Sequence, residues 1–145
     1  MKLKSHIHTK IRNLFSDWLL PARRIHVTFW ISSKTAPMDE IGRRIGIENC
    51  TVKTVVPKNP VAKPYWNVDV TAHGLCIEDP LRELITKLEP KAGVIKDILS
   101  EIGEIPTLVV FVESKWFDRP ILSLPPNVLK FFAQFDTEIC FDVNY

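Results

Sequence analysis

Histidines and cysteines are the residues of this chain whose chemistry can be judged most directly from spacing. His6 and His8 are two residues apart, so they cannot share a helical face, and His26 and His73 lie in separate segments. No pair of Cys or His residues has the short spacing of a zinc site. We therefore predict no metal site and no cofactor.

Nucleophilic catalysis needs an activated Cys or Ser with a base within reach. Cys140 has an outward position in a predicted strand, beside Asp142, and His26 has an outward position in another. Nothing in the spacing brings Cys140 and His26 together, and cysteine is among the residue types most often buried. A chemical role for Cys140 or His26 stays open, and we predict that the protein is not an enzyme.

Paired carboxylates are explained by the predicted helices. The acidic pairs at 39–40 and 78–79 fall near helix starts, where negative charge interacts favourably with the helix dipole. Glu101 and Glu104 fall on a helix terminus or solvent face. The glycines are scattered and form no phosphate-binding loop.

Length and cysteine usage indicate one domain in a reducing compartment. The chain has 145 residues and no run approaching the ~18 to 20 apolar residues of a membrane span. Its three cysteines lack paired spacing, which argues against a disulfide framework. Charged residues interrupt the apolar residues after the basic N-terminus, so we predict no secretory signal and a cytoplasmic protein.

The N-terminal arm, residues 1–23, differs in charge from the rest of the chain. Residues 1–24 hold six basic residues against one acidic residue, so they carry +5, and the net charge of +2 leaves −3 for the remainder. Residues 5–20 have the apolar spacing of an amphipathic helix, which ends at Pro21. We expect this helix to cover an open sheet face, in its own chain or in a dimer mate, in preference to contact with a membrane surface.

Residues 24–145 are predicted to form a single α+β domain. Alternating or β-branched segments predict strands, and the segments between them have helical apolar stripes. We expect a single mixed or antiparallel sheet with helices on one face, built from a ferredoxin-like βαββαβ core and a C-terminal βαβ extension. Asp79-Pro80 is expected to cap its helix, and Pro90 to break or kink it. The expected strands are 25–31, 51–56, 65–71, 107–112, 121–124 and 137–143, and the expected helices are 37–46, 79–103 and 125–135.

The predicted core lies between this sheet and its helices. The expected buried side chains are Phe29, Val68, Val110 and Phe141 from the strands, with Leu84, Ile95 and Phe132 from the helices.

Two groups of residues are candidates for binding. Trp30, Tyr65 and Asp69 point away from the predicted helix layer. The loop at 114–119 carries aromatic and basic residues that have no periodic role, namely Trp116, Phe117 and Arg119. We expect a protein-interaction domain, immunity- or adaptor-like, that binds a protein partner or a second copy of itself.

Two alternatives stay open. One is a small-molecule-binding protein or enzyme with a pocket near Trp30, Tyr65 and Asp69. The other is a nucleic-acid-binding module that stacks bases on Trp30 and Tyr65, which the outward carboxylates Asp69, Glu138 and Asp142 disfavour.

The order of these features resembles a family of bacterial proteins, domain of unknown function 4279, from about Arg24 to Tyr145. The resemblance rests on the order of several features. These are the opening strand, the short helix ending at Gly46-Ile47, Trp66 at a strand start, the sequence Leu-Glu-Pro-Lys at 88–91, the sequence Leu-Ser-Leu-Pro at 122–125 before a helix, and the closing sequence Asp-Val-Asn-Tyr at 142–145. Members often have a Gly-Asp pair before the tryptophan, where this chain has the proline-rich loop 57–64. The resemblance implies a compact α/β domain and supplies no activity or catalytic residues.

Overall fold

Alternating apolar residues place β1 (Arg24–Ser32) at the centre of the sheet. The structure is a computed structural model that describes residues 24–54, 62–74, 76–113 and 122–144. Ile25, Val27, Phe29 and Ile31 are fully buried on one face of β1. The predicted apolar face of this strand is confirmed.

The described strands form one mixed sheet. β1 pairs antiparallel with β3 (Tyr65–His73) and with β4 (Thr107–Glu113). β2 (Cys50–Lys53) pairs antiparallel with β3, and β5 (Glu138–Asn144) pairs parallel with β4, giving the order β2-β3-β1-β4-β5. The predicted α+β class with a single sheet is confirmed, and β4 is an interior strand, as its apolar residues on both faces indicate.

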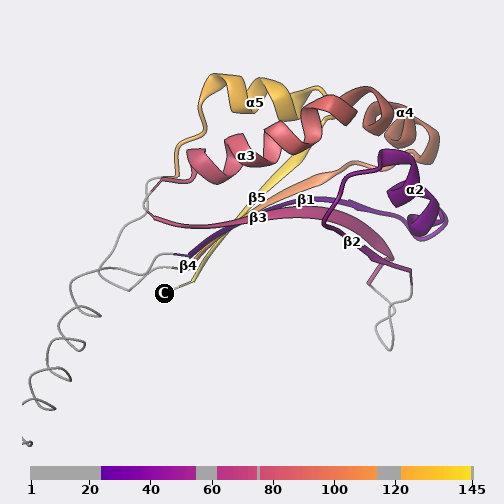
Figure 1. Ribbon diagram of the computed structural model, residues 1–145, viewed down its shortest axis with the longest axis horizontal. Helices are drawn as coiled ribbons and strands as arrows, with labels where there is room; N and C mark the ends of the chain where they lie inside the picture. The colour runs from indigo at the N-terminus through magenta and orange to yellow at the C-terminus, as the bar shows by residue number, and fades with distance from the viewer. Residues whose placement is uncertain (1–23, 55–61, 75, 114–121, 145) are drawn as a thin grey trace, which may run out of the picture.

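The described helices cover one face of this sheet (Figure 1). They are α2 (Met38–Ile45), α3 (Glu78–Leu88), α4 (Ala92–Ile102) and α5 (Pro126–Ala133). Pro90 lies in the 3-10 turn η1 (Glu89–Lys91), which separates α3 from α4 as predicted. Gly46 ends α2 in the left-handed conformation, with φ of 62°, a conformation that favours glycine.

The core lies between the helices and the sheet. The Phe29 ring packs against Phe132 and Phe135, with centroids 6.0 and 5.8 Å away. Trp66 and Val68 from β3 are also fully buried. The core therefore contains six of the predicted residues, which are Phe29, Val68, Val110, Leu84, Ile95 and Phe132.

The prediction that Phe141 is buried is wrong. Phe141 pairs with Val110, so both side chains lie on the helix side of the sheet, but Phe141 is 42% exposed. The reason is the strand order, because β5 is the last strand and has a described neighbour on one side only. The alternation of β5 identifies the correct face of the strand but not its position at the sheet edge.

Three element boundaries also differ from the predictions. Asp79 is not the N-cap, because α3 begins at Glu78 after Ile77 and has no side-chain cap hydrogen bond. Leu122–Leu124 form no strand, so the C-terminal extension consists of α5 and β5 added to β4. β2 ends at Lys53, and residues 55 and 56 of the predicted strand lie outside the described residues, as does the predicted N-terminal helix.

Candidate functional site

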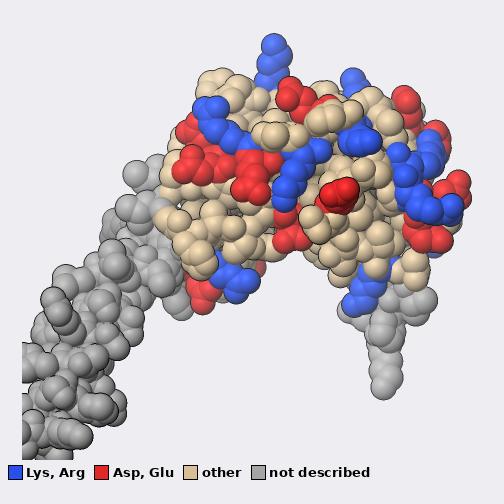
Figure 2. Space-filling model, in the orientation of Figure 1, with Lys and Arg blue, Asp and Glu red and all other residues tan. Residues whose placement is uncertain are grey.

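The face of the sheet away from the helices, called the open face here, is the candidate site. The sheet is arched, and the described residues are hollowed on the side away from the helical layer (Figures 1 and 2). Strand pairing places alternate residues of each strand on this face. The open-face residues are Arg24, His26, Thr28, Trp30 and Ser32 from β1, Thr51 and Lys53 from β2, Tyr65, Asn67, Asp69, Thr71 and His73 from β3, Thr107, Val109, Phe111 and Glu113 from β4, and Glu138, Cys140, Asp142 and Asn144 from β5.

The three predicted site residues of β1 and β3 come together on this face. Trp30 pairs with Asn67, so Tyr65 is its diagonal neighbour, and the Trp30 and Tyr65 ring centroids are 4.7 Å apart at 55°. Asp69 pairs with Thr28, one residue pair away on the same face. All three predicted residues are half-buried.

Two polar atoms beside the aromatic pair lack hydrogen-bond partners. Trp30 Nε1 is a donor and Asn67 Oδ1 is an acceptor, and each is buried without a partner among the described residues. A third buried atom, Nε1 of the core residue Trp66, also lacks a partner among the described residues, so unpaired polar atoms are not confined to the open face. The sequence suggested Trp30 through its outward position, whereas nothing in the sequence suggested the unpaired atoms.

A polar cluster lies next to the aromatic pair. The His26 ring approaches the Thr71 hydroxyl at 2.7 Å through Nδ1 and the Thr28 hydroxyl at 3.0 Å through Nε2. The Asp69 carboxylate is 3.9 Å from Nδ1 of His26. Thr28 is only 5% exposed, so its hydroxyl is buried beneath the surface of the open face.

Cys140 does not join this cluster. Thr28 pairs with Val109 and Val109 pairs with Cys140, so β4 separates Cys140 from β1 by about 10 Å. Phe111 likewise lies between His26 and Asp142. The Cys–His site left open by the sequence is therefore not formed, and half-buried Val109 and Phe111 occupy the intervening surface.

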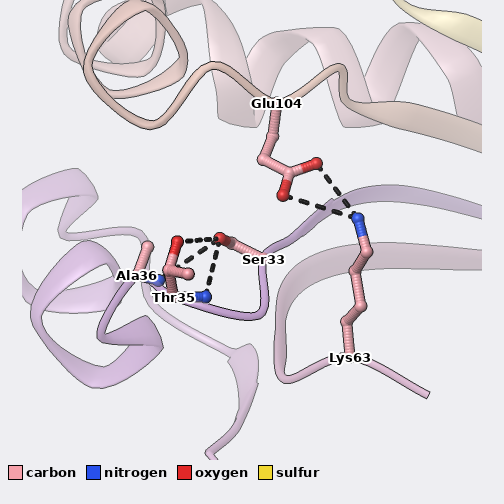
Figure 3. A network of polar contacts seen from close by, with 5 residues as sticks. All are labelled: Ser33, Thr35, Ala36, Lys63 and Glu104. Carbon is pink, nitrogen blue, oxygen red and sulfur yellow. Dashed lines mark hydrogen bonds and ion pairs between the residues drawn. The ribbon is translucent and has the colours of Figure 1, made fainter. Parts of the chain in front are cut away.

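One end of the sheet is fixed by polar contacts near the candidate site (Figure 3). The Ser33 hydroxyl accepts hydrogen bonds from the backbone N–H groups of Thr35 and Ala36, at 3.2 Å each, and stabilises the turn into α2. Lys63, just before β3, pairs with Glu104, just before β4, at 3.2 Å. The Ser33 N–H also donates to the Pro64 carbonyl at 3.2 Å, so these contacts together hold the starts of β3 and β4 near the end of β1.

A pocket of about 380 Å³ lies away from the open face, between the end of α4 and the turn after α5. Leu99 and Phe135 are among its apolar residues, and Lys96, Glu104 and Asp136 contribute charge.

Arg44 of α2 and Glu101 of α4 form an ion pair with two hydrogen bonds. These hydrogen bonds lower the pKa of Glu101 and raise the pKa of Arg44.

Several of the residues considered in the sequence analysis lie in segments that the structure does not describe. Trp116, Phe117 and Arg119 lie outside the described residues, as do His6 and His8. Among the residues that are described, no three His, Cys, Asp or Glu side chains gather as a metal-binding group. In the same part of the chain, no helix has the length and apolar character required to cross a bilayer.

Comparison with known proteins gives a family match. No curated protein and no solved structure matches the chain. A family model, Domain of unknown function (DUF4279), matches residues 23–145, which include every described element. The chain therefore belongs to the DUF4279 family.

Proposed function

We propose that this protein is a non-enzymatic interaction domain whose open face binds a protein partner, as in an immunity- or adaptor-like role. The observation that carries the proposal is the one-sided sheet: helices cover one face, and aromatic and aliphatic side chains are half-buried on the other. Tyr and Trp are enriched at the centres of protein interfaces, where they supply most of the binding energy. Trp30, Tyr65, Val109 and Phe111 provide such a centre.

The unpaired polar atoms support the same proposal. The carbonyl and N–H groups of a bound backbone are the kinds of group that the Trp30 indole N–H and the Asn67 amide oxygen lack as partners within the described part of the chain. The polar residues Asp69, Thr71 and His26 border the aromatic pair, as a polar rim borders an interface core. A cytoplasmic location is part of this proposal.

The second candidate is a small-molecule site or an enzyme, and one observation favours it. Asp69, His26 and Thr28 lie in the order of an acid, a base and a hydroxyl nucleophile. Two features disfavour catalysis: Thr71 lies closer to His26 Nδ1 than Asp69 does, and the Thr28 hydroxyl belongs to a buried residue that a substrate does not reach. The cluster is better explained as hydrogen bonding between β1 and β3.

A nucleic-acid ligand is disfavoured by charge. Among the described residues, the open face carries four carboxylates, Asp69, Glu113, Glu138 and Asp142, against two basic residues, Arg24 and Lys53. Carboxylates at these positions repel phosphate groups, whereas nucleic-acid sites gather Lys and Arg.

We also propose that residues 24–113 are a ferredoxin-like unit. The order β2-β3-β1-β4, with β1 antiparallel to both neighbours, supports this proposal, as does the order of helices between the strands.

Site-specific photo-crosslinking in the source organism tests the proposed function. A benzophenone amino acid replaces Tyr65 on the open face, and a matched control replaces Leu129, which is exposed on α5. We expect the Tyr65 probe to capture a discrete protein that the Leu129 probe does not, and Trp30→Lys to abolish this capture while circular dichroism shows an intact fold. Equal capture at both positions, or capture unaffected by Trp30→Lys, would contradict the proposal.

The small-molecule alternative is tested by a separate measurement. Native mass spectrometry of protein purified from the same cells would detect a retained small molecule. A bound molecule that is lost in Trp30→Lys, together with no captured protein at Tyr65, would establish the small-molecule function in place of the one proposed.

A further inference from the structure

The two edges of the sheet differ in how they are protected. β2 has four residues and ends in an exposed lysine, Lys53, and short edges with lysine resist pairing with other strands. β5 has seven residues, of which Glu138 and Asp142 are charged and point to the open face, and it contains no Lys, Arg or Pro. A long edge without lysine or proline is a template for adding another strand.

The backbone of β5 presents unused hydrogen-bonding groups at this edge. The Glu138 N–H donates to the Pro106 carbonyl at 3.0 Å, so Glu138 faces β4. Because backbone groups alternate sides along a strand, Ile139, Phe141 and Val143 direct their N–H and C=O groups outward. No strand pairs with this side of β5 in the described part of the chain.

The side chains of the same three residues share one face. Ile139, Phe141 and Val143 pair with Leu108, Val110 and Val112, whose side chains are buried on the helix side of the sheet. Ile139 and Val143 are half-buried, and Phe141 is the large apolar residue left exposed between them. The edge thus combines outward backbone groups with an apolar row.

We propose that β5 pairs antiparallel with β5 of a second copy of this chain, about a two-fold axis at Phe141. The strand is self-complementary about this residue: Ile139 lies opposite Val143, Cys140 opposite Asp142, and Phe141 opposite its own copy. Apolar residues meet on the helix side and polar residues on the open face, so the two sheets continue into one.

A two-fold axis at Phe141 is more favourable than an axis at Cys140 or at Asp142. Ile139–Val143 and Phe141–Phe141 become hydrogen-bonded pairs, so every outward N–H and C=O of the three residues gains a partner. An axis at Cys140 places Glu138 opposite Asp142, and an axis at Asp142 places that carboxylate opposite its own copy. Both alternatives set like charges in direct opposition, which destabilises a sheet.

In the proposed register, carboxylates of the two β5 strands are diagonal neighbours across the interface. Asp142 is diagonal to Glu138 and to Asp142 of the second copy, at roughly 7–8 Å for diagonal strand neighbours. This repulsion is screened by salt. It predicts that removing the Asp142 charge tightens the dimer, a direction opposite to the loss expected at Phe141.

Sedimentation equilibrium of the full chain across micromolar concentrations tests the interface. We expect a dimer for the natural chain, roughly tenfold or greater weakening for Phe141→Lys, and tighter association for Asp142→Asn. Leu129→Lys is the matched control, because Leu129 is 44% exposed and Phe141 is 42% exposed, and it should remain dimeric. A monomeric natural chain, as would follow if residues 1–23 or another partner occupied the edge, overturns the proposal, as does a dimer that Phe141→Lys leaves unchanged.

Disulfide cross-linking, at concentrations where the variant chains are dimeric, locates the axis from geometry. Three chains each carry one cysteine, at position 140, 141 or 142, through Phe141→Cys or Asp142→Cys and replacement of the remaining natural cysteines by Ser. At a two-fold axis the paired Cα atoms lie about 5.5 Å apart, within disulfide range. We expect the position 141 chain alone to form a covalent dimer rapidly on mild oxidation. Faster cross-linking at 140 or 142, or at none of them, overturns the proposed register.

Discussion

Gly42 of α2 provides the most direct test of how the helices pack on the sheet. A Cβ atom at this position would lie 3.0 Å from Cγ2 of Val52 and 3.2 Å from Cδ1 of Trp66. Both distances are shorter than ordinary van der Waals contact between carbon atoms. Gly42→Ala therefore sets the helix-forming advantage of alanine against overpacking.

The magnitudes indicate which effect is larger. Alanine is more favourable than glycine inside a helix by about 1 kcal/mol, and overpacking of a core costs about 1–3 kcal/mol. Val52 is 38% exposed on a short edge strand and can turn away, but Trp66 is fully buried and cannot. We expect Gly42→Ala to lower the free energy of unfolding by about 0–2 kcal/mol.

Gly93 in α4 is the matched control. Nothing lies within 4 Å of a Cβ atom built there, so Gly93→Ala should raise the free energy of unfolding by up to about 1 kcal/mol. Urea denaturation of both variants, followed by tryptophan fluorescence, measures the difference, which we expect to be about 1–3 kcal/mol. Adding Val52→Ala to Gly42→Ala should recover part of the loss, because it removes one of the two close contacts. Equal stabilisation by Gly42→Ala and Gly93→Ala would refute the close approach of α2 to Trp66.

Two further predictions concern the core and an ion pair. Phe29→Ala should cost roughly 3–5 kcal/mol and Phe141→Ala less than about 1 kcal/mol, when urea unfolding is measured at a concentration that keeps the protein monomeric; similar losses would place Phe141 in the core after all. Hydrogen bonds from Arg44 hold the pKa of Glu101 below its ordinary value of 4.5, so the pair contributes stability above that pH and loses it as the pH falls through the folded-state pKa. Glu101→Gln should flatten the acid side of the pH–stability profile, and an unchanged profile would show that the exposed pair contributes nothing.

Local patterns in the sequence determined the elements and their buried faces. Alternation with period two predicts the buried face of β1, because successive side chains of a strand point to opposite sides. Pro90 separates two helices because its ring removes a backbone donor, and Gly46 ends α2 because it adopts positive φ readily. These outcomes depend on a few neighbouring residues, so the sequence predicts them without knowledge of the sheet.

The candidate site was predicted in part for the same reason. The outward direction of Trp30, Tyr65 and Asp69 follows from alternation, and the structure places all three on the open face. Their closeness depends on the pairing of β1 with β3, whose residues are far apart in the chain. The same pairing brings Trp30 beside Asn67 and His26 beside Thr71, contacts that no spacing indicates.

The strand order was decided only by the tertiary structure, and it accounts for the main errors. Phe141 has the same alternation as Phe29, yet one lies in the outermost strand and the other in the central strand. Cys140 and His26 are both outward, but β4 lies between them. Arg44 and Glu101 meet across 57 residues because α2 and α4 pack on the same face. Burial and contact depend on which elements become neighbours, and that choice follows from the free energy of the whole core, which short-range patterns do not contain.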